Sequence, residues 1–211
     1  MNLVSLKIEA SGGDYFYKLE LSDGTFLSLK PCYLDDYGED PASWEIGKEF
    51  SPSDEEALRF AAACYKAEQA GMRLVGNAEQ TRLGLIRKLE QRGHERACVQ
   101  AVISRFVELD LVNDGRYAEF WLRSKLAKRG GKIPGPKKLS ASLGNKGVDR
   151  AAISGAFDKV LDEEAEFALL ERFLEKNAHS RFPLGEEGYS LRGFLKSEGF
   201  SADVLNRYFE R

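Results

Sequence analysis

The residues with the clearest chemical potential are a cluster of lysines and arginines near the middle of the chain. Residues 121–150 carry nine cations and a single carboxylate, Asp149, which gives this segment a charge of +8. The whole protein has a formal net charge of −3, so the remaining residues sum to −11. A concentrated positive charge on an acidic protein is typical of a surface that contacts a polyanion or an acidic protein. The nine cations are Arg123, Lys125, Lys128, Arg129, Lys132, Lys137, Lys138, Lys146 and Arg150.

The positions of Lys137 and Lys138 favour contact with an external anion. Gly135-Pro136 predicts the start of a helix, because proline in the first helical turn loses no hydrogen bond. Free N–H groups at a helix start attract anions, whereas lysines there oppose the helix dipole. A bound external anion accounts for both features. A solvated lysine-rich face that binds nothing is the alternative interpretation.

Two other sequence features suggest nucleotide or metal chemistry only superficially. The glycine-rich segment around Gly130-Gly131-Lys132 lacks the preceding strand and the Ser or Thr of a phosphate-binding P-loop, which argues against nucleotide hydrolysis. His94 and Cys98 are four residues apart, but no second pair of ligands has the spacing of a zinc site. The sequence therefore predicts no metal and no cofactor.

The carboxylates also have a structural explanation. The acidic runs at residues 54–56 and 162–164 stand at predicted helix starts, where negative charge complements the dipole. No nucleophile and base can be paired, so we expect no enzymatic activity. The aromatic residues Phe106, Tyr117, Phe120 and Trp121 could stack on bases, but their helical spacing indicates core positions. The predicted helix at residues 149–161 exposes too few polar groups to read base edges.

The overall composition indicates a globular cytoplasmic protein. Of its 211 residues, 43% are hydrophobic and 31% charged, and no apolar run approaches the roughly 20 residues that cross a bilayer. The chain opens from Met1 without the pattern of a signal peptide. Three widely spaced cysteines, an odd number, predict reduced thiols rather than a disulfide framework. We expect no membrane association and a monomer.

The first 50 residues predict a small β segment. Residues 15–21 alternate between apolar and polar side chains, and Asp23-Gly24 leads into a second apolar run from Phe26. An Asp-Gly pair between two such runs predicts a hairpin, since glycine takes the positive φ of the turn. Residues 1–72 carry a charge of −8, so this part of the chain should avoid DNA phosphates.

From residue 53 onward the sequence predicts helices. Ser53 can cap a long helix over about residues 54–77, and Thr81 opens the next one. A middle group of helices begins at Asn113, with Tyr117, Ala118, Trp121 and Leu122 as its apolar stripe. A third group begins near Asp162 and contains a loop over residues 183–188.

These helices form a threefold internal repeat. Superposing Gly93, Gly147 and Gly199 aligns a leucine four residues upstream and an apolar residue six residues downstream in every copy. Each glycine can end one helix in the left-handed conformation, and the residue two positions later can cap the next helix. Repeated units of this kind bury their apolar faces on their neighbours, which predicts an elongated array. The aligned leucines are Leu89, Leu143 and Leu195.

Three stretches of these helices carry a resemblance to a known family. They are residues 81–89 (TRLGLIRKL), residues 112–118 (VNDGRYA, followed by Trp121 and Leu122), and residues 135–139 (GPKKL, followed by Leu143 and Lys146-Gly147-Val148). In order and spacing they resemble the RecX family, the regulators of RecA recombinase. The similarity spans about residues 72–211.

The resemblance implies a fold and a function. The fold is mainly α, with three tandem three-helix repeats in an elongated array after a small N-terminal β-hairpin segment. The expected boundaries are 1–50 for the β segment and 51–111, 112–161 and 162–211 for the repeats. RecX proteins bind in the groove of the RecA–single-stranded-DNA filament and inhibit RecA recombinase, ATPase and coprotease activities, which places them in DNA repair and the SOS response. They have no known catalytic activity.

We therefore expect a non-catalytic regulator that binds the RecA filament and single-stranded DNA, with weaker binding to duplex DNA. The alternatives are a general DNA-binding protein that acts without RecA, and a helical adaptor that binds only protein. Equal affinity for bare DNA and filament would favour the first, and inhibition that survives loss of the central lysines would favour the second. The expected contact residues are Arg82, Arg87, Lys88, Arg123, Lys125, Lys128, Arg129, Lys132, Lys137, Lys138, Lys146 and Arg150.

Overall fold

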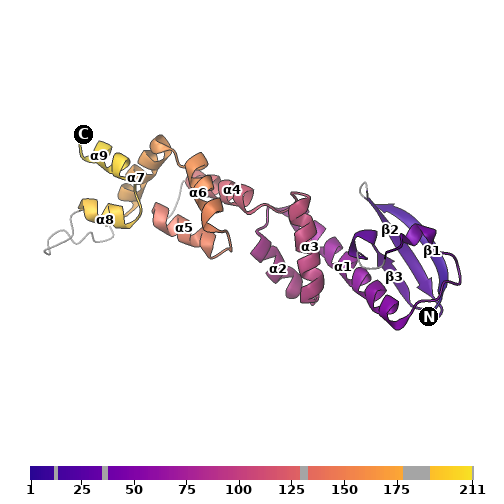
Figure 1. Cartoon of the computed structure of the whole chain (residues 1–211). Coiled ribbons are helices and arrows are strands. Elements are labelled where there is room, and N and C mark those ends of the chain that lie inside the picture. The colour runs from indigo at the N-terminus through magenta and orange to yellow at the C-terminus, as the bar shows by residue number, and fades with distance from the viewer. Residues whose placement is uncertain (12–13, 35–37, 129–132, 178–190, 211) are drawn as a thin grey trace. The chain divides into compact units, whose positions relative to one another are not determined.

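The computed structural model describes residues 1–11, 14–34, 38–128, 133–177 and 191–210 (Figure 1). The chain divides into two compact units, Met1–Val112 and Asn113–Arg211. The described part of the first unit holds a sheet and the first three α-helices, and that of the second unit holds six further helices. This arrangement confirms the predicted mainly α fold with a small N-terminal β segment.

The N-terminal sheet has three antiparallel strands in the order β1-β2-β3 (Figure 1). β1 covers Leu3–Ser11, β2 Asp14–Leu21 and β3 Phe26–Leu29. The predicted hairpin is confirmed as the β2–β3 pair, and Gly24 in its turn has a φ of 81°. Residues 3–11, which precede the hairpin, form the further strand β1, so the segment is a small three-stranded sheet rather than a single hairpin.

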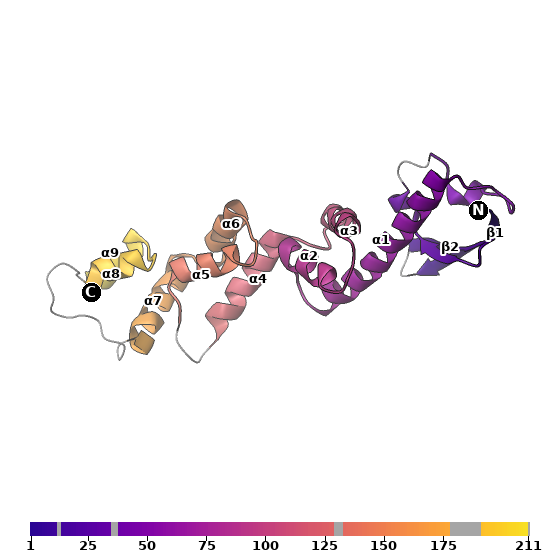
Figure 2. The ribbon, with the colours of Figure 1, turned by 90° about the horizontal axis from the view of Figure 1, so that it is seen from below.

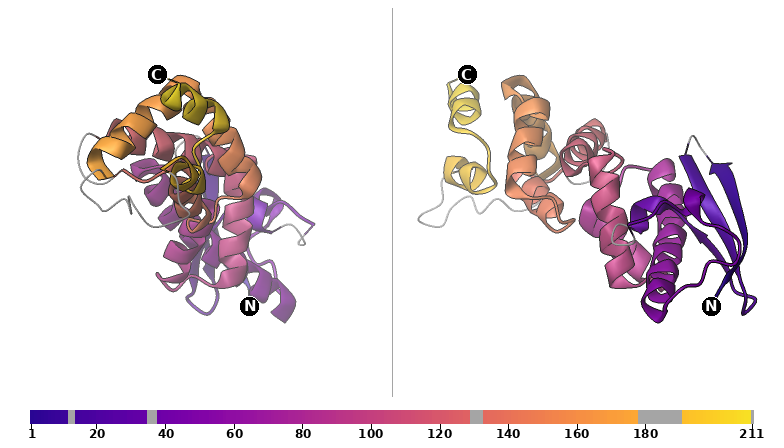
Figure 3. Two further views of the ribbon diagram at one scale, coloured as in Figure 1. Left: turned by 90° about the vertical axis from the view of Figure 1, so that its left-hand side faces the viewer. Right: turned by 45° about the vertical axis from the view of Figure 1, so that its right-hand side comes forward.

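The sheet shares its hydrophobic core with the first three helices. α1 (Pro52–Asn77) packs against the sheet and also against α3 (Arg96–Glu108) and α2 (Arg82–Glu90) (Figures 2 and 3). Gly71 of α1 permits a close approach, because a Cβ there would lie 2.8 Å from the ring of Phe106. The buried core runs without a break from the sheet to α3, through residues such as Leu19, Leu29, Leu58, Leu85 and Val102.

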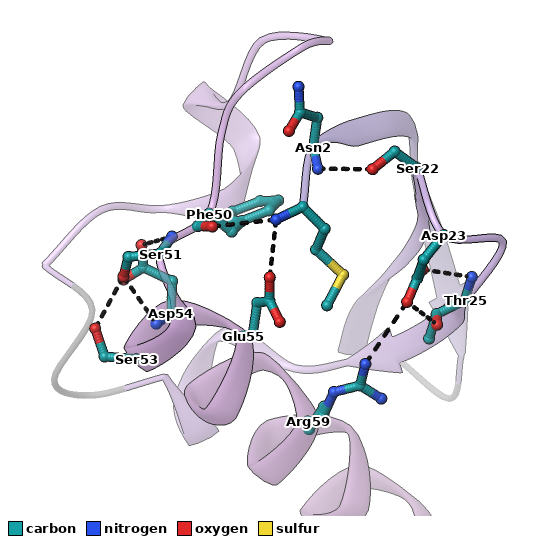
Figure 4. Close-up of polar contacts among 11 residues, drawn as sticks. Asn2, Ser22, Asp23, Thr25, Phe50, Ser51, Ser53, Asp54, Glu55 and Arg59 are labelled. Carbon is teal, nitrogen blue, oxygen red and sulfur yellow. Dashed lines mark hydrogen bonds and ion pairs between the residues drawn. The ribbon is translucent and has the colours of Figure 1, made fainter.

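The start of α1 is tied to the sheet by polar contacts (Figure 4). Ser51 caps the helix and forms a capping box with Asp54, so the helix begins at Pro52, two residues before the predicted start. Ser51 is the cap rather than Ser53 because Pro52, with its fixed φ, fits the first helical position. The amino group of Met1 lies 2.8 Å from the Glu55 carboxylate, and Arg59 lies 3.7 Å from Asp23 in the β2–β3 turn.

The second unit is built from α4 (Asp114–Ala127), α5 (Pro136–Gly144), α6 (Arg150–Val160), α7 (Glu163–Asn177), α8 (Leu191–Ser197) and α9 (Ala202–Phe209). The predicted helix starts at Asn113 and Gly135-Pro136 are confirmed. Asp162 accepts a hydrogen bond from the Ala165 N–H at 2.9 Å, at the predicted start of the third group. The predicted loop over residues 183–188 lies outside the described residues.

The three repeated corners form as the sequence predicts, except that Glu95 makes no side-chain hydrogen bond at the start of its helix, whereas Asp149 and Ser201 do. Gly93, Gly147 and Gly199 have φ values of 82°, 86° and 96°. In each corner the residue after the glycine donates its N–H to the carbonyl oxygen of the aligned leucine, over 3.2, 3.2 and 3.3 Å. This is the bonding pattern of a Schellman motif, which satisfies the last carbonyls of a helix. The helix pairs α2–α3, α5–α6 and α8–α9 are therefore three copies of one motif.

Each compact unit has one hydrophobic core. In the second unit it joins Leu122 of α4, Leu139 of α5, Ile153 of α6, Leu170 of α7 and Leu205 of α9. The finer boundaries at residues 50, 111 and 161 stay a prediction.

Candidate functional site

Ten of the twelve predicted contact residues are described by the structure, and all ten are exposed. Arg129 and Lys132 lie outside the described residues. Arg82, Arg87 and Lys88 lie on α2 in the first unit. The others belong to the second unit, in or beside α4, α5 and α6: Arg123, Lys125, Lys128, Lys137, Lys138, Lys146 and Arg150.

Packing forces the second group of cations outward. Ala118 and Leu122 of α4, Leu139 and Leu143 of α5, and Ile153 of α6 fill the space between the three helices. An ion pair of 2.6 Å between Lys159 of α6 and Glu119 of α4 links two of them at the surface. Because the inner faces are apolar and filled, the charged side chains point to solvent.

Lys125 and Lys88 have local partners. The Lys125 ammonium lies 5.2 Å from the centre of the Trp121 ring, one helical turn away. Such a cation–π contact is worth about 0.5–1 kcal/mol at an exposed site, so it orients Lys125 without neutralising it. On α2, Lys88 donates a hydrogen bond to the side-chain oxygen of Gln80 at 2.7 Å. Trp121 itself is half-buried and Phe120 is 64% exposed, although helical spacing predicts core positions for both.

The C-terminal end of α4 is held by an arginine from α7. Arg172 donates from Nη1 to the carbonyl oxygen of Leu126 at 2.7 Å, and from Nη2 to that of Lys128 at 2.5 Å. These carbonyls have no partner inside the helix. Arg172 therefore positions Lys128. No sequence pattern predicts this residue, because a helix-end contact across 46 residues leaves no local signal.

The start of α5 contacts the α8–α9 corner. The Lys137 N–H donates to the carbonyl oxygen of Glu198 at 2.9 Å, and the Lys138 ammonium lies 3.4 Å from the Glu198 carboxylate. Glu198 thus supplies part of the negative charge that the sequence suggested would come from an external anion. The Lys138 side chain remains 67% exposed, and an ion pair this open to solvent is weak. Lys138 is therefore still able to contact a polyanion.

The first unit contains a separate polar cluster beneath the sheet. The Lys30 ammonium lies 2.5 Å from Asp14 and 2.6 Å from Glu68, and the Tyr33 hydroxyl donates to Glu68 at 2.6 Å. Burial alone would lower the pKa of Lys30, but its hydrogen bonds to both carboxylates outweigh that effect and raise the pKa. Burial and the Glu68 hydrogen bond raise the pKa of Tyr33. The groups of this cluster are engaged with one another, so we assign it a structural role.

Metal binding and membrane insertion find no support in the described residues. They contain no group of three or more His, Cys, Asp or Glu side chains that could hold a metal ion. None of the helices in the described ranges is long and apolar enough to cross a membrane.

Comparison with known proteins decides the family. No protein-family model matches the chain. Regulatory protein RecX of Treponema pallidum (strain Nichols) is 32% identical over 162 residues, which are 74% of this chain and 92% of that protein. Regulatory protein RecX of Halorhodospira halophila is 32% identical over 68% of this chain and 86% of its own length. The chain belongs to the RecX family.

Solved RecX structures share the fold. One crystal structure of a regulatory protein RecX aligns with 100% of this chain and 99% of its own, with a TM-score of 0.71 and 17% sequence identity. RecX from Lactobacillus salivarius aligns with 70% of this chain and 95% of its own, with a TM-score of 0.51 and 24% identity. The first alignment covers the N-terminal sheet as well as the helices, so the sheet is part of a RecX fold seen elsewhere.

Proposed function

We propose that this RecX protein binds the RecA–single-stranded-DNA filament and inhibits RecA recombinase, ATPase and coprotease activities without catalysing a reaction itself. Membership of a family of regulatory proteins supports a regulatory role. The observation that carries the proposal is the exposure of the seven described site cations in or beside the three packed helices α4, α5 and α6. A nucleoprotein filament offers both phosphates and acidic protein surface to such a group of cations.

We attribute inhibition to occupation of the filament groove by the protein. Cations on the second unit bind phosphate or carboxylate groups of the filament and hold the protein in its groove. Bound protein then occludes the groove and blocks strand exchange. Binding to the filament by itself would stabilise the filament, so disassembly follows because the bound protein also blocks filament growth while RecA continues to dissociate. No bond is made or broken by this RecX protein.

The decisive experiment is RecA-dependent ATP hydrolysis on single-stranded DNA with and without the protein. We expect the rate to fall as the protein is added. A matched pair of variants identifies the surface: replacing Lys128, Lys137 and Lys138 with alanine should weaken inhibition, whereas replacing the exposed Lys66, Lys176 and Lys196 should leave it unchanged. An unchanged rate at saturating protein would refute the proposal.

The same variants separate the alternatives. A general DNA-binding protein would bind bare single-stranded DNA as tightly as the filament at physiological salt. A protein-only adaptor would inhibit equally well after loss of Lys128, Lys137 and Lys138. Either result would replace the proposed function.

A further inference from the structure

Among the described residues, the outer edge of β1 pairs with other backbone only at its beginning. The Leu3 N–H donates to the carbonyl oxygen of Lys48 at 2.9 Å, and the Gly47 N–H donates to that of Leu3 at 2.8 Å. An isolated bridge pairs Asn2 with Glu49. From Val4 to Ser11, no other strand of the described chain pairs with this edge. An uncovered edge strand presents a row of backbone donors and acceptors that another strand can complete.

The side chains at the middle of this edge form a short charged pattern around an apolar residue. Ile8 is 58% exposed, with Lys7 before it and Glu9 after it on the opposite face of the sheet. Glu9 forms an ion pair of 2.8 Å with Lys18 of β2. Lys7 stands directly opposite Lys18, a like charge, and makes no ion pair with any described residue.

We propose that this edge binds a second copy of the chain, with two β1 strands paired antiparallel about a two-fold axis through Ile8. In this register, Ile8 stands opposite Ile8 of the second copy. Lys7 stands opposite Glu9 of the second copy, and the symmetry repeats that contact. The paired segment runs from Ser5 to Ser11 and joins two three-stranded sheets into one. This inference does not depend on the proposed action on RecA.

The charges of Lys7 and Glu9 favour this strand register over the registers with the two-fold axis at an adjacent residue. A two-fold axis perpendicular to the sheet keeps each face on its own side, so only residues of the same face stand opposite one another. An axis through Lys7 would oppose two lysines, and an axis through Glu9 would oppose two glutamates. Like charges directly opposite each other destabilise a sheet, whereas opposite charges stabilise it. An axis through Leu6 would extend the pairing to Leu3, where the edge is already covered.

The same pattern explains why the partner is a second copy rather than an unrelated strand. An isologous interface must be its own complement. A cation and an anion placed symmetrically around an exposed apolar residue meet that requirement. The sequence predicts a monomer because nothing in it shows that β1 lies at an edge.

The test measures the mass of the full chain in solution by light scattering and native mass spectrometry over a concentration series. The wild type is expected to form a dimer as concentration rises. Lys7→Glu places a glutamate opposite Glu9 at both symmetry-related contacts, and Glu9→Lys places a lysine opposite Lys7 at both, so each variant alone should be monomeric. An equimolar mixture of the two variants pairs two glutamates of one copy with two lysines of the other, and should form a dimer with one copy of each.

A matched control separates the edge from the rest of the sheet. Lys18→Glu reverses a charge on the same face and removes the Glu9–Lys18 ion pair, but it lies one strand away from the edge and should leave the dimer intact. Circular dichroism confirms that each variant is folded. A wild type that stays monomeric, a mixture of folded variants that fails to pair, or a Lys18→Glu variant that abolishes the dimer would overturn the proposal.

Discussion

Arg172 of α7 holds the end of α4 by donating a hydrogen bond from Nη1 to the carbonyl oxygen of Leu126 at 2.7 Å. A cation at a helix C-terminus also complements the negative end of the dipole. The place where the chain leaves α4, within the basic segment, is therefore determined by a residue of α7. The position of Lys128 depends on a tertiary contact.

Replacing Arg172 with alanine should destabilise the second unit by about 1–2 kcal/mol, since two hydrogen bonds from a charged group are lost. Urea unfolding measures this change. Hydrogen exchange should also accelerate in the last turn of α4. Lys176→Ala on the same helix is the control, because an exposed substitution normally changes stability by less than about 0.5 kcal/mol. Equal costs for both variants would contradict the role assigned to Arg172.

Salt dependence should report the number of cations that contact phosphate. Replacing Lys128, Lys137 and Lys138 with alanine should reduce the steepness of log affinity against log salt by about 2 for single-stranded DNA, at roughly 0.7 for each lost contact. The binding constant is measured by fluorescence anisotropy at several salt concentrations. Alanine at Lys66, Lys176 and Lys196 should leave the slope unchanged. Parallel slopes for both variants would mean that these lysines do not contact DNA.

The loss of stability caused by alanine at each corner glycine should follow the backbone strain and crowding at that position. Gly93→Ala should cost about 1–2 kcal/mol, because φ is 82° there but a Cβ would meet no atom within 4 Å. Gly199→Ala should cost more, because its Cβ would also lie 2.8 Å from the backbone nitrogen of Lys137. Gly76→Ala in α1 should instead stabilise the protein by about 0.5–1 kcal/mol, since Gly76 is helical and uncrowded. Thermal unfolding of the three variants gives the order, and any other order would contradict this ranking.

His94 should make the stability of the first unit depend on pH. Burial, together with the charges of Lys66 and Arg92, lowers the pKa of His94 in the folded protein. The unfolded chain then binds the proton more readily, so the free energy of unfolding falls as pH drops below about 6.5.

The other two corners carry Val148 and Phe200 at the position of His94, which makes His94→Val the natural test. The variant should be at least as stable as the wild type at pH 7, and its advantage should grow as the pH is lowered towards 5. Urea unfolding across this range measures the difference. A constant difference between the two proteins would show that His94 is not the titrating group.

Part of this structure could be read from local sequence alone. The corners at Gly93, Gly147 and Gly199 were predictable because a left-handed glycine and an upstream leucine interact within a few residues of each other, and at the last two corners a side-chain cap follows. The same holds for the helix start at Gly135-Pro136 and for the turn at Gly24. The local sequence also predicts that the central cations are exposed, because charged side chains that alternate with an apolar helix stripe lie on its solvent-facing side.

Tertiary structure alone decided how these elements are joined. The Arg172 contact with Leu126 and the approach of Glu198 to Lys137 each link residues that are distant in the chain. Their partners are chosen by packing, and neither periodicity nor spacing encodes that choice. The uncovered edge of β1 belongs to the same class, because whether a strand lies at an edge depends on every other strand. The sequence therefore determined the repeated helical corner and the positive charge of the central segment. The tertiary structure determined which helix ends and which strand edges already have a partner.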